Sequence, residues 1–160
     1  MRFCEEGFQV LGFDIDSKKV ETLKKGRSYL KSIPSSKISP FIRSGRLDVT
    51  DDFSRLSDPD CILICVPTSL TEKMEPDLQY IESTTESIRK YLRKGQLIVL
   101  ESTTYPGTTE ELILPRLQSG GLKARGEFFL GFSPEREDPG NTQFTTGKIP
   151  KIVAGVTPSC

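Results

Sequence analysis

Histidine and tryptophan are absent from this chain of 160 residues. Without histidine, neither a Ser-His-Asp triad nor a histidine-containing zinc site can be built from it. An excess of charge of either sign is missing too, because 22 lysines and arginines balance 22 aspartates and glutamates. This balance excludes a partner that is bound through bulk charge, so we expect neither nucleic acid nor an anionic membrane as a ligand.

Long apolar runs are also missing. The longest, around residues 61–67 and 96–100, have the size of single strands and fall far short of the ~20 residues that cross a bilayer. The first residues, MRFCEEGF, contain no apolar signal region. We therefore expect a cytoplasmic protein without a membrane segment.

Cysteine is scarce, and the spacing of Cys4, Cys61, Cys65 and Cys160 does not form a disulfide framework. On one strand, Cys61 and Cys65 would lie about 13 Å apart at ~3.3 Å per residue, which is too far to share a metal ion. We therefore predict no metal site, and we predict that both are small buried side chains in a reducing compartment.

The chain does contain strand-sized apolar runs that alternate with helix-sized amphipathic runs. This alternation predicts one α/β domain over residues 1–160, a mostly parallel sheet with helices on both faces. We expect strands at residues 8–14, 45–50, 60–67, 96–102, 128–133 and 151–154. We expect helices at residues 17–25, 38–43, 51–57, 77–92 and 108–117, the last one distorted at Pro115.

Small, polar and proline residues follow three of the expected strands. Pro67 and Thr68 follow one, the stretch ESTTYPG follows the next, and SPER follows the strand at residues 128–133. One such segment alone is ordinary loop chemistry. The carboxyl ends of parallel strands lie along one edge of a sheet, however, and ligands bind there. The three segments together therefore predict one crevice.

Asp14 ends the expected strand at residues 8–14. In a dinucleotide-binding fold, the acid at the end of the second strand binds the adenosine ribose, ~20 residues after the glycine motif. The alternative is that Asp14 or Asp16 only caps the following helix. Only 13 residues precede Asp14, their single glycine is Gly7, and no G-x-G-x-x-G occurs. We therefore expect an incomplete doubly wound, Rossmann-like domain that lacks its first strand and glycine loop.

Several segments in order along the chain resemble the UDP-sugar 6-dehydrogenases, which include UDP-glucose, UDP-N-acetylglucosamine and UDP-N-acetylmannosamine dehydrogenases. The matching segments are GFDID at residues 12–16 with KV at 19–20, GRSYLKSIP at 26–34, ICVPTSLT at 64–71, EPDL at 75–78, LESTTYPGTT at 100–109 and FSPEREDPGN at 132–141. The last two look more like the branch that acts on UDP-N-acetylhexosamines. The family implies NAD-dependent oxidation of the C6 hydroxyl of a UDP-sugar to a carboxylate, in two steps.

The resemblance also implies roles for single residues. The cofactor-binding residues would be Asp14 and Lys19 at the adenosine half, Val66, Pro67 and Thr68 along the crevice, and Ser102 and Thr103 under the nicotinamide. Thr103 would also hold the reacting oxygen or a catalytic water. Glu135 would act as a general base or orient water for thioester hydrolysis, with Arg136 beside the substrate.

Other parts of the family pattern fall outside this chain. The catalytic cysteine, the oxyanion-stabilising lysine and asparagine, and most uridine contacts would lie beyond Cys160, so we expect the central and C-terminal substrate domains to be absent. Pro139 stands where the UDP-glucose branch has a second glutamate. We therefore expect the NAD-binding portion of a nucleotide-sugar dehydrogenase, with weak or no binding of NAD and no activity by itself.

The alternative is a non-catalytic interaction or regulatory module. In the sheet order 3-2-1-4-5-6, loss of strand 1 leaves unpaired edges on the strands at residues 8–14 and 61–66. Unpaired edges favour self-association or pairing with another chain. We expect the fold to centre on residues 61–154, with the first ~50 residues less stable.

Overall fold

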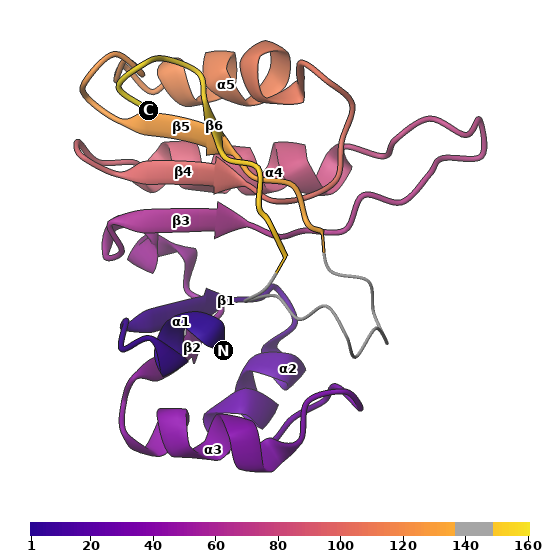
Figure 1. Cartoon of the computed structure of the whole chain (residues 1–160), viewed down its shortest axis with the longest axis vertical. Helices are drawn as coiled ribbons and strands as arrows, with labels where there is room; N and C mark the ends of the chain where they lie inside the picture. Colours follow the sequence, from indigo (N-terminus) through magenta and orange to yellow (C-terminus); the bar gives the residue numbers. More distant parts are fainter. Residues whose placement is uncertain (137–148) are drawn as a thin grey trace. The chain divides into compact units, whose positions relative to one another are not determined.

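The computed structural model describes residues 1–136 and 149–160. They form two compact units, Met1–Ser54 and Arg55–Cys160, and each unit contains its own sheet (Figure 1). Within the described residues, β1 pairs with β2 alone, and the second sheet has the order β3-β4-β5-β6. The strands β1 and β3 therefore each have one side without a partner strand in the described part of the chain.

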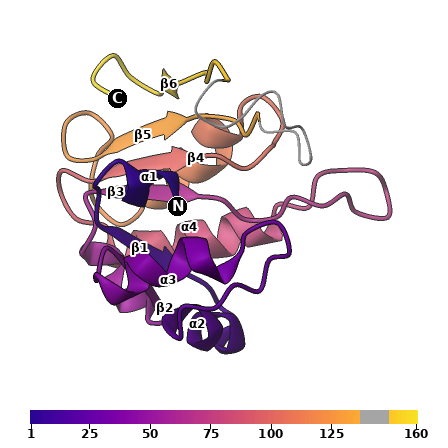
Figure 2. The same cartoon turned by 60° about the horizontal axis from the view of Figure 1, so that its bottom comes forward.

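The first unit is a parallel strand pair packed with three helices, which Figure 2 brings forward. Its elements are α1 (Arg2–Glu5), β1 (Val10–Phe13), α2 (Ser17–Lys24), α3 (Ser35–Arg43) and β2 (Leu47–Thr50). The register runs from Val10 opposite Leu47 to Phe13 opposite Thr50. Its small core consists of Cys4, Val20, Ile38, Leu47 and Val49.

The second unit begins within the 3₁₀ turn η1 (Phe53–Ser57) and forms a four-stranded sheet. Its further elements are β3 (Cys61–Ile64), α4 (Gln79–Tyr91), β4 (Leu97–Leu100), η2 (Thr109–Ile113), α5 (Leu114–Gln118), β5 (Phe129–Phe132) and β6 (Ala154–Gly155). The first three strands are parallel and in register, whereas β6 is antiparallel to β5.

Two segments of the second unit differ from the sequence prediction. The helix expected at residues 108–117 is a π-helical turn, η2, followed by α5. Pro115 stands in the first turn of α5, where its missing N–H costs little, so the irregular turn precedes the proline. The expected strand at residues 151–154 is shifted to Ala154–Gly155.

The core of the second unit lies on one face of its sheet. Side chains alternate along a strand, so Ile62 and Ile64 point to the same face. That face is buried against the helices, together with Ile81, Ile88, Ile98, Leu100, Ile113, Leu117 and Leu130. Cys61 and Cys65 lie at the alternate positions and are exposed, so the prediction that both thiols are buried is wrong. The apolar run around them did not reveal which face the helices cover.

Gln96 fixes the start of β4 to the loop before β3. Its side chain is fully buried, and its Nε2 donates to the carbonyls of Leu56 (2.9 Å) and Pro59 (2.7 Å). Its Oε1 accepts the backbone N–H of Arg93 at 2.9 Å. A buried amide with all of these partners satisfied holds both segments in place.

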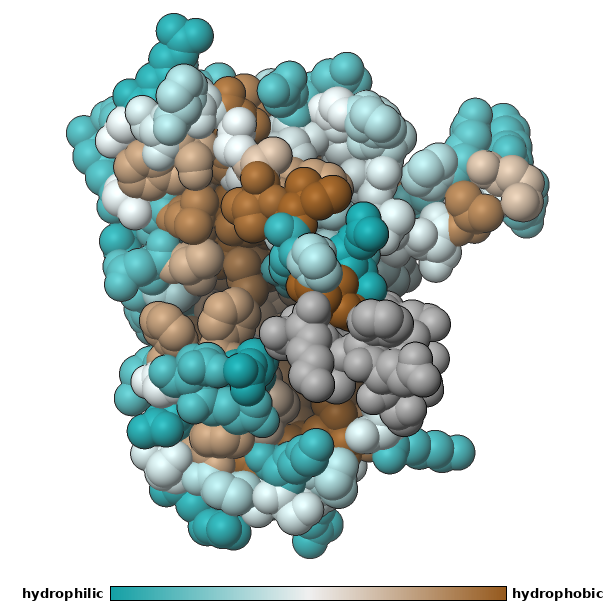
Figure 3. Space-filling view, in the orientation of Figure 1, coloured by the Kyte–Doolittle hydropathy of each residue, from teal (hydrophilic) through white to brown (hydrophobic). Residues whose placement is uncertain are grey.

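A hairpin projects from the second unit between β3 and α4 (Figures 1 and 3). It is closed by an isolated bridge between Leu70 and Pro76. Met74 adopts a φ of 61°, an uncommon conformation for a residue with a side chain. Leu70 and Met74 are 56% and 74% exposed.

Candidate functional site

The ends of β3 and β4 are fastened to each other by Ser102. Its hydroxyl is buried and donates to the carbonyl of Val66 at 2.7 Å, and its backbone N–H donates to the carbonyl of Ile64 at 3.2 Å. The serine thus brings the segment that contains Pro67 and Thr68 next to the segment that contains Thr103. This is the juxtaposition that the sequence predicts for the carboxyl ends of parallel strands.

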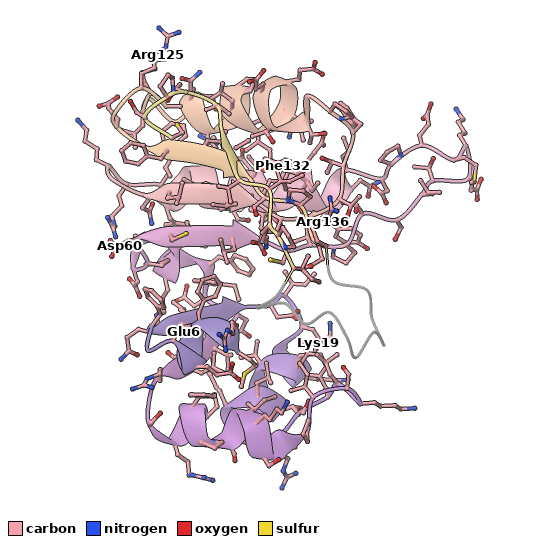
Figure 4. All side chains as sticks on the ribbon, in the orientation of Figure 1. Glu6, Lys19, Asp60, Arg125, Phe132 and Arg136 are labelled. Atoms are coloured by element: carbon pink, nitrogen blue, oxygen red, sulfur yellow. The ribbon has the colours of Figure 1, made fainter. Side chains whose placement is uncertain are left out.

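The end of β5 joins the same edge through backbone hydrogen bonds. The N–H of Ser133 donates to the carbonyl of Leu100 (2.9 Å), and the N–H of Glu135 donates to the carbonyl of Glu101 (3.2 Å). The side chains of Glu135 and Arg136 are exposed, and Arg136 lies beyond the carboxyl end of β5 (Figure 4). We call this set the strand-end edge: Val66, Pro67, Thr68, Ser102, Thr103, Ser133, Glu135 and Arg136.

Glu101 lies at the centre of the strand-end edge, although the sequence assigns it no role. Its carboxylate is 17% exposed and accepts Lys151 Nζ at 2.6 Å and Cys65 Sγ at 3.6 Å. Part of Cys65 is exposed, but its sulfur lies against this carboxylate. Burial of the sulfur, together with the negative charge of Glu101, raises the pKa of the Cys65 thiol to about 11. The thiol is therefore protonated at neutral pH.

The motif ESTTYPG contains Glu101, but no sequence signal points to its partners. Lys151 is 50 residues and Cys65 36 residues away along the chain. Only the folded chain brings the three side chains together.

Asp14 and Asp16 have different partners in the first unit. The Asp16 carboxylate accepts the N–H of Lys18 at 3.0 Å and is the N-cap of α2. Asp14 Oδ1 accepts the N–H of Asp16 at 2.9 Å, and Asp14 Oδ2 lies 3.7 Å from Lys19 Nζ. The Lys19 ammonium, labelled in Figure 4, also lies 5.7 Å from the ring centre of Tyr29. Asp16 is thus the helix cap, whereas Asp14 is not.

The position of Asp14 fits recognition of a ribose. Its side chain is 29% exposed at the end of a parallel strand, and one of its oxygens faces no backbone donor of α2. A partly exposed carboxylate at such a position can accept hydrogen bonds from two neighbouring hydroxyl groups. The chemistry of this acceptor therefore suits the adenosine half of NAD.

A hollow of about 260 Å³ lies in the second unit beside the motif that follows β4. It is lined by Gly107, Thr109, Glu110, Phe132, Ala154, Gly155 and Val156. None of the predicted site residues lines it: Asp14 and Lys19 belong to the first unit, and the others lie along the strand-end edge.

Residues 1–136 and 149–160 contain no group of three metal-ligating side chains. No helix among them has the length and apolar character needed to cross a bilayer. The residues of FSPEREDPGN after Arg136, Pro139 included, lie outside the described residues.

Comparison with known proteins identifies relatives along the whole chain. A model of the NAD-binding domain of the UDP-glucose/GDP-mannose dehydrogenase family matches residues 1–159. The UDP-N-acetyl-D-glucosamine 6-dehydrogenase of Pseudomonas aeruginosa is 34% identical over 150 residues, which are 93% of this chain and 35% of that protein. The UDP-N-acetyl-D-mannosamine dehydrogenase of Pyrococcus horikoshii is 29% identical over 97% of this chain and 37% of its own length.

A solved structure is similar in both fold and sequence. The NDP-N-acetyl-D-galactosaminuronic acid dehydrogenase from Methanosarcina mazei Go1 has a TM-score of 0.80 and 31% identity, and the match covers 94% of this chain and 34% of that one. The chain thus spans about a third of the length of the relatives it matches. The likeness confirms the Rossmann-like α/β fold that the sequence predicts.

Proposed function

Because the chain belongs to the UDP-glucose/GDP-mannose dehydrogenase family, as an NAD-binding domain, we propose that it serves the oxidation of a UDP-sugar at C6 to the uronate. The observation that carries the proposal is the strand-end edge, where Ser102 and Glu101 bring the ends of three strands together. The motifs STTYPGTT and SPEREDPGN favour a UDP-N-acetylhexosamine over a UDP-hexose.

The first unit provides the adenosine half of the cofactor site. The family makes NAD the cofactor. Asp14 accepts hydrogen bonds from the ribose hydroxyls, and Lys19, whose Nζ lies 3.7 Å from Asp14 Oδ2, helps to orient the carboxylate. A carboxylate at this position also repels a 2′-phosphate, which favours NAD over NADP.

The strand-end edge provides the nicotinamide half and the substrate contacts. A bound NAD would supply the acceptor for the hydride that leaves C6 of the sugar. Val66, Pro67 and Thr68 line its crevice, Ser102 supports the floor, and the Thr103 hydroxyl holds the reacting oxygen or a water molecule. The Glu135 carboxylate takes a proton from that water, and the Arg136 guanidinium pairs with an anionic part of the substrate.

The isolated chain binds NAD weakly and turns over no substrate. The support for this is that the 160 residues contain no G-x-G-x-x-G, the loop whose backbone amides bind the pyrophosphate in dinucleotide-binding folds. Its four free thiols, which form no disulfide, favour the reducing cytoplasm as its compartment.

Titration of the chain with NAD in a calorimeter tests the proposal. We expect a dissociation constant on the order of 1 mM, which corresponds to a binding free energy of about −4 kcal/mol. Absence of binding at several millimolar NAD would contradict the cofactor site. Formation of NADH from NAD and UDP-N-acetylglucosamine by the isolated chain would contradict its inactivity.

A second candidate function is that of an interaction module. It is favoured by the strands β1 and β3, which each have one side without a partner strand in the described residues. Such an edge can accept a strand from another chain. Sedimentation that shows only a monomer, with no retention of a full-length dehydrogenase, would contradict this candidate.

A further inference from the structure

Glu101 contacts all of the segments that build the strand-end edge. Its backbone N–H donates to the carbonyl of Ile64 at 2.9 Å, which fixes it to the end of β3. Its backbone carbonyl accepts the N–H of Glu135 at 3.2 Å, which fixes the segment after β5. Its carboxylate binds the Lys151 ammonium through one oxygen and the Cys65 thiol through the other.

The two oxygens of the carboxylate are thus bound by two different chain segments: Oε1 by Lys151 and Oε2 by Cys65, which directly follows β3. The 2.6 Å distance to Lys151 Nζ is that of a charge-assisted hydrogen bond, and the carboxylate is 17% exposed. An ion pair in a partly buried place is screened less by solvent than one on the open surface. A side chain held in this way leaves its own peptide group little freedom to turn.

We propose that Glu101 is a positioning residue, which holds Glu135 at the strand-end edge while Lys151 holds the Glu101 carboxylate in its orientation. The catalytic role of Glu135 rests on the proposed function above, but the positioning does not. When the carboxylate is held by Lys151 and Cys65, the peptide oxygen of Glu101 points steadily at the N–H of Glu135. Loss of either contact lets this peptide turn and releases Glu135.

The pKa of the Cys65 thiol depends on the charges around Glu101, so its reactivity can be used to follow them. The charged groups that act on it are Glu101 and Glu135, which raise its pKa, and Lys151, which lowers it. Glu101→Gln removes the nearest negative charge and keeps an oxygen acceptor, so the pKa of the thiol falls. Lys151→Met removes the positive charge, so the pKa rises.

The first readout is the rate at which iodoacetamide alkylates Cys65 at pH 8.5, measured by mass spectrometry of the peptide that contains it. The rate follows the thiolate fraction, which changes about tenfold for each unit of pKa. We expect a faster rate in Glu101→Gln, by roughly tenfold, and a slower rate in Lys151→Met. Cys160 is the internal control, because its pKa is set by burial and by hydrogen bonds with Thr157 and Leu130. A simple loosening of the fold would accelerate alkylation in both variants, and this outcome would overturn the proposal.

The second readout is hydrogen exchange at the backbone N–H of Glu135, measured by NMR. We expect it to exchange several times faster in both variants. The N–H of Ser133 is the matched control, because it donates to the carbonyl of Leu100 rather than to Glu101. Unchanged exchange at Glu135 in both variants would also overturn the proposal. Failure of the unmodified chain to bind NAD would contradict the proposed function and would leave both readouts unaffected.

Discussion

Asp14 and Asp16, the two acids after β1, have different contacts and therefore different roles. From the sequence, Asp14 could bind a ribose, or either Asp14 or Asp16 could cap the following helix. The structure gives the cap to Asp16, whose carboxylate accepts the N–H of Lys18, and places Lys19 beside Asp14. The ribose-binding role that we propose for Asp14 is therefore separable from the stability of α2.

We predict that Asp14→Asn weakens NAD binding roughly tenfold or more, because a hydrogen bond to a charged acceptor contributes about 1.5–3 kcal/mol. The asparagine keeps an oxygen for the N–H of Asp16, so the turn is preserved. The binding constant is measured by following the NMR shifts of the adenosine protons of NAD.

Asp16→Asn is the matched control, and we expect it to leave NAD binding unchanged, since asparagine is also a good helix cap. Equal weakening in both variants would show that the loop shape, rather than the Asp14 carboxylate, determines affinity.

Among the elements, strand β3 shows that an apolar run predicts a strand but does not predict which of its two faces is buried. The run CILICV predicts a buried strand, and a strand forms there. Burial follows the alternation of side chains, however, so Ile62 and Ile64 are buried while Cys61 and Cys65 are exposed. Which of the two sets faces the helices depends on the path of the chain through α4 and α5.

The side chain of Gln96 joins the start of β4 to the loop before β3, so we predict that its removal destabilises the second unit. We expect Gln96→Leu to lower the free energy of unfolding by about 1–3 kcal/mol, because it removes the side-chain donor to the carbonyl of Leu56 and the acceptor for the N–H of Arg93. The carbonyl of Pro59 loses one donor but keeps Arg93 Nη2, at 3.2 Å. Urea titration followed by circular dichroism measures the change.

Gln118→Leu is the control for this substitution. Gln118 is half-buried, and its Oε1 accepts a single N–H, that of Ala124, at 3.4 Å. We expect a loss well below that of Gln96→Leu. Equal losses would mean that the amide of Gln96 stabilises the fold no more than a peripheral one.

At the scale of the whole molecule, the two units differ in the size of their cores. The first unit buries Cys4, Val20, Ile38, Leu47 and Val49 beneath a sheet of two strands. Two paired strands are marginally stable unless helices cover them. The second unit pairs four strands and contains all of the other buried apolar side chains of the described residues.

We therefore predict that the backbone amides of β1 and β2 exchange with solvent faster than those of β3, β4 and β5, at least tenfold at neutral pH. Native-state hydrogen exchange resolved by NMR measures the difference, because protection follows the free energy of local opening. The helix amides of α4 serve as an internal reference within the second unit. Equal protection of Val10–Phe13 and Cys61–Ile64 in a monomer would contradict this prediction.

The amino-acid sequence was enough to predict the order of strands and helices and the polar segments after three strands, and its motifs were enough to identify the family. Each of these depends on residues that are neighbours along the chain, where spacing and turn chemistry act directly. The tertiary structure alone decided which acid caps α2, which face of β3 is buried and which partners hold Glu101. Those partners, Cys65 and Lys151, lie 36 and 50 residues away, and contacts over such distances depend on where folding carries each segment.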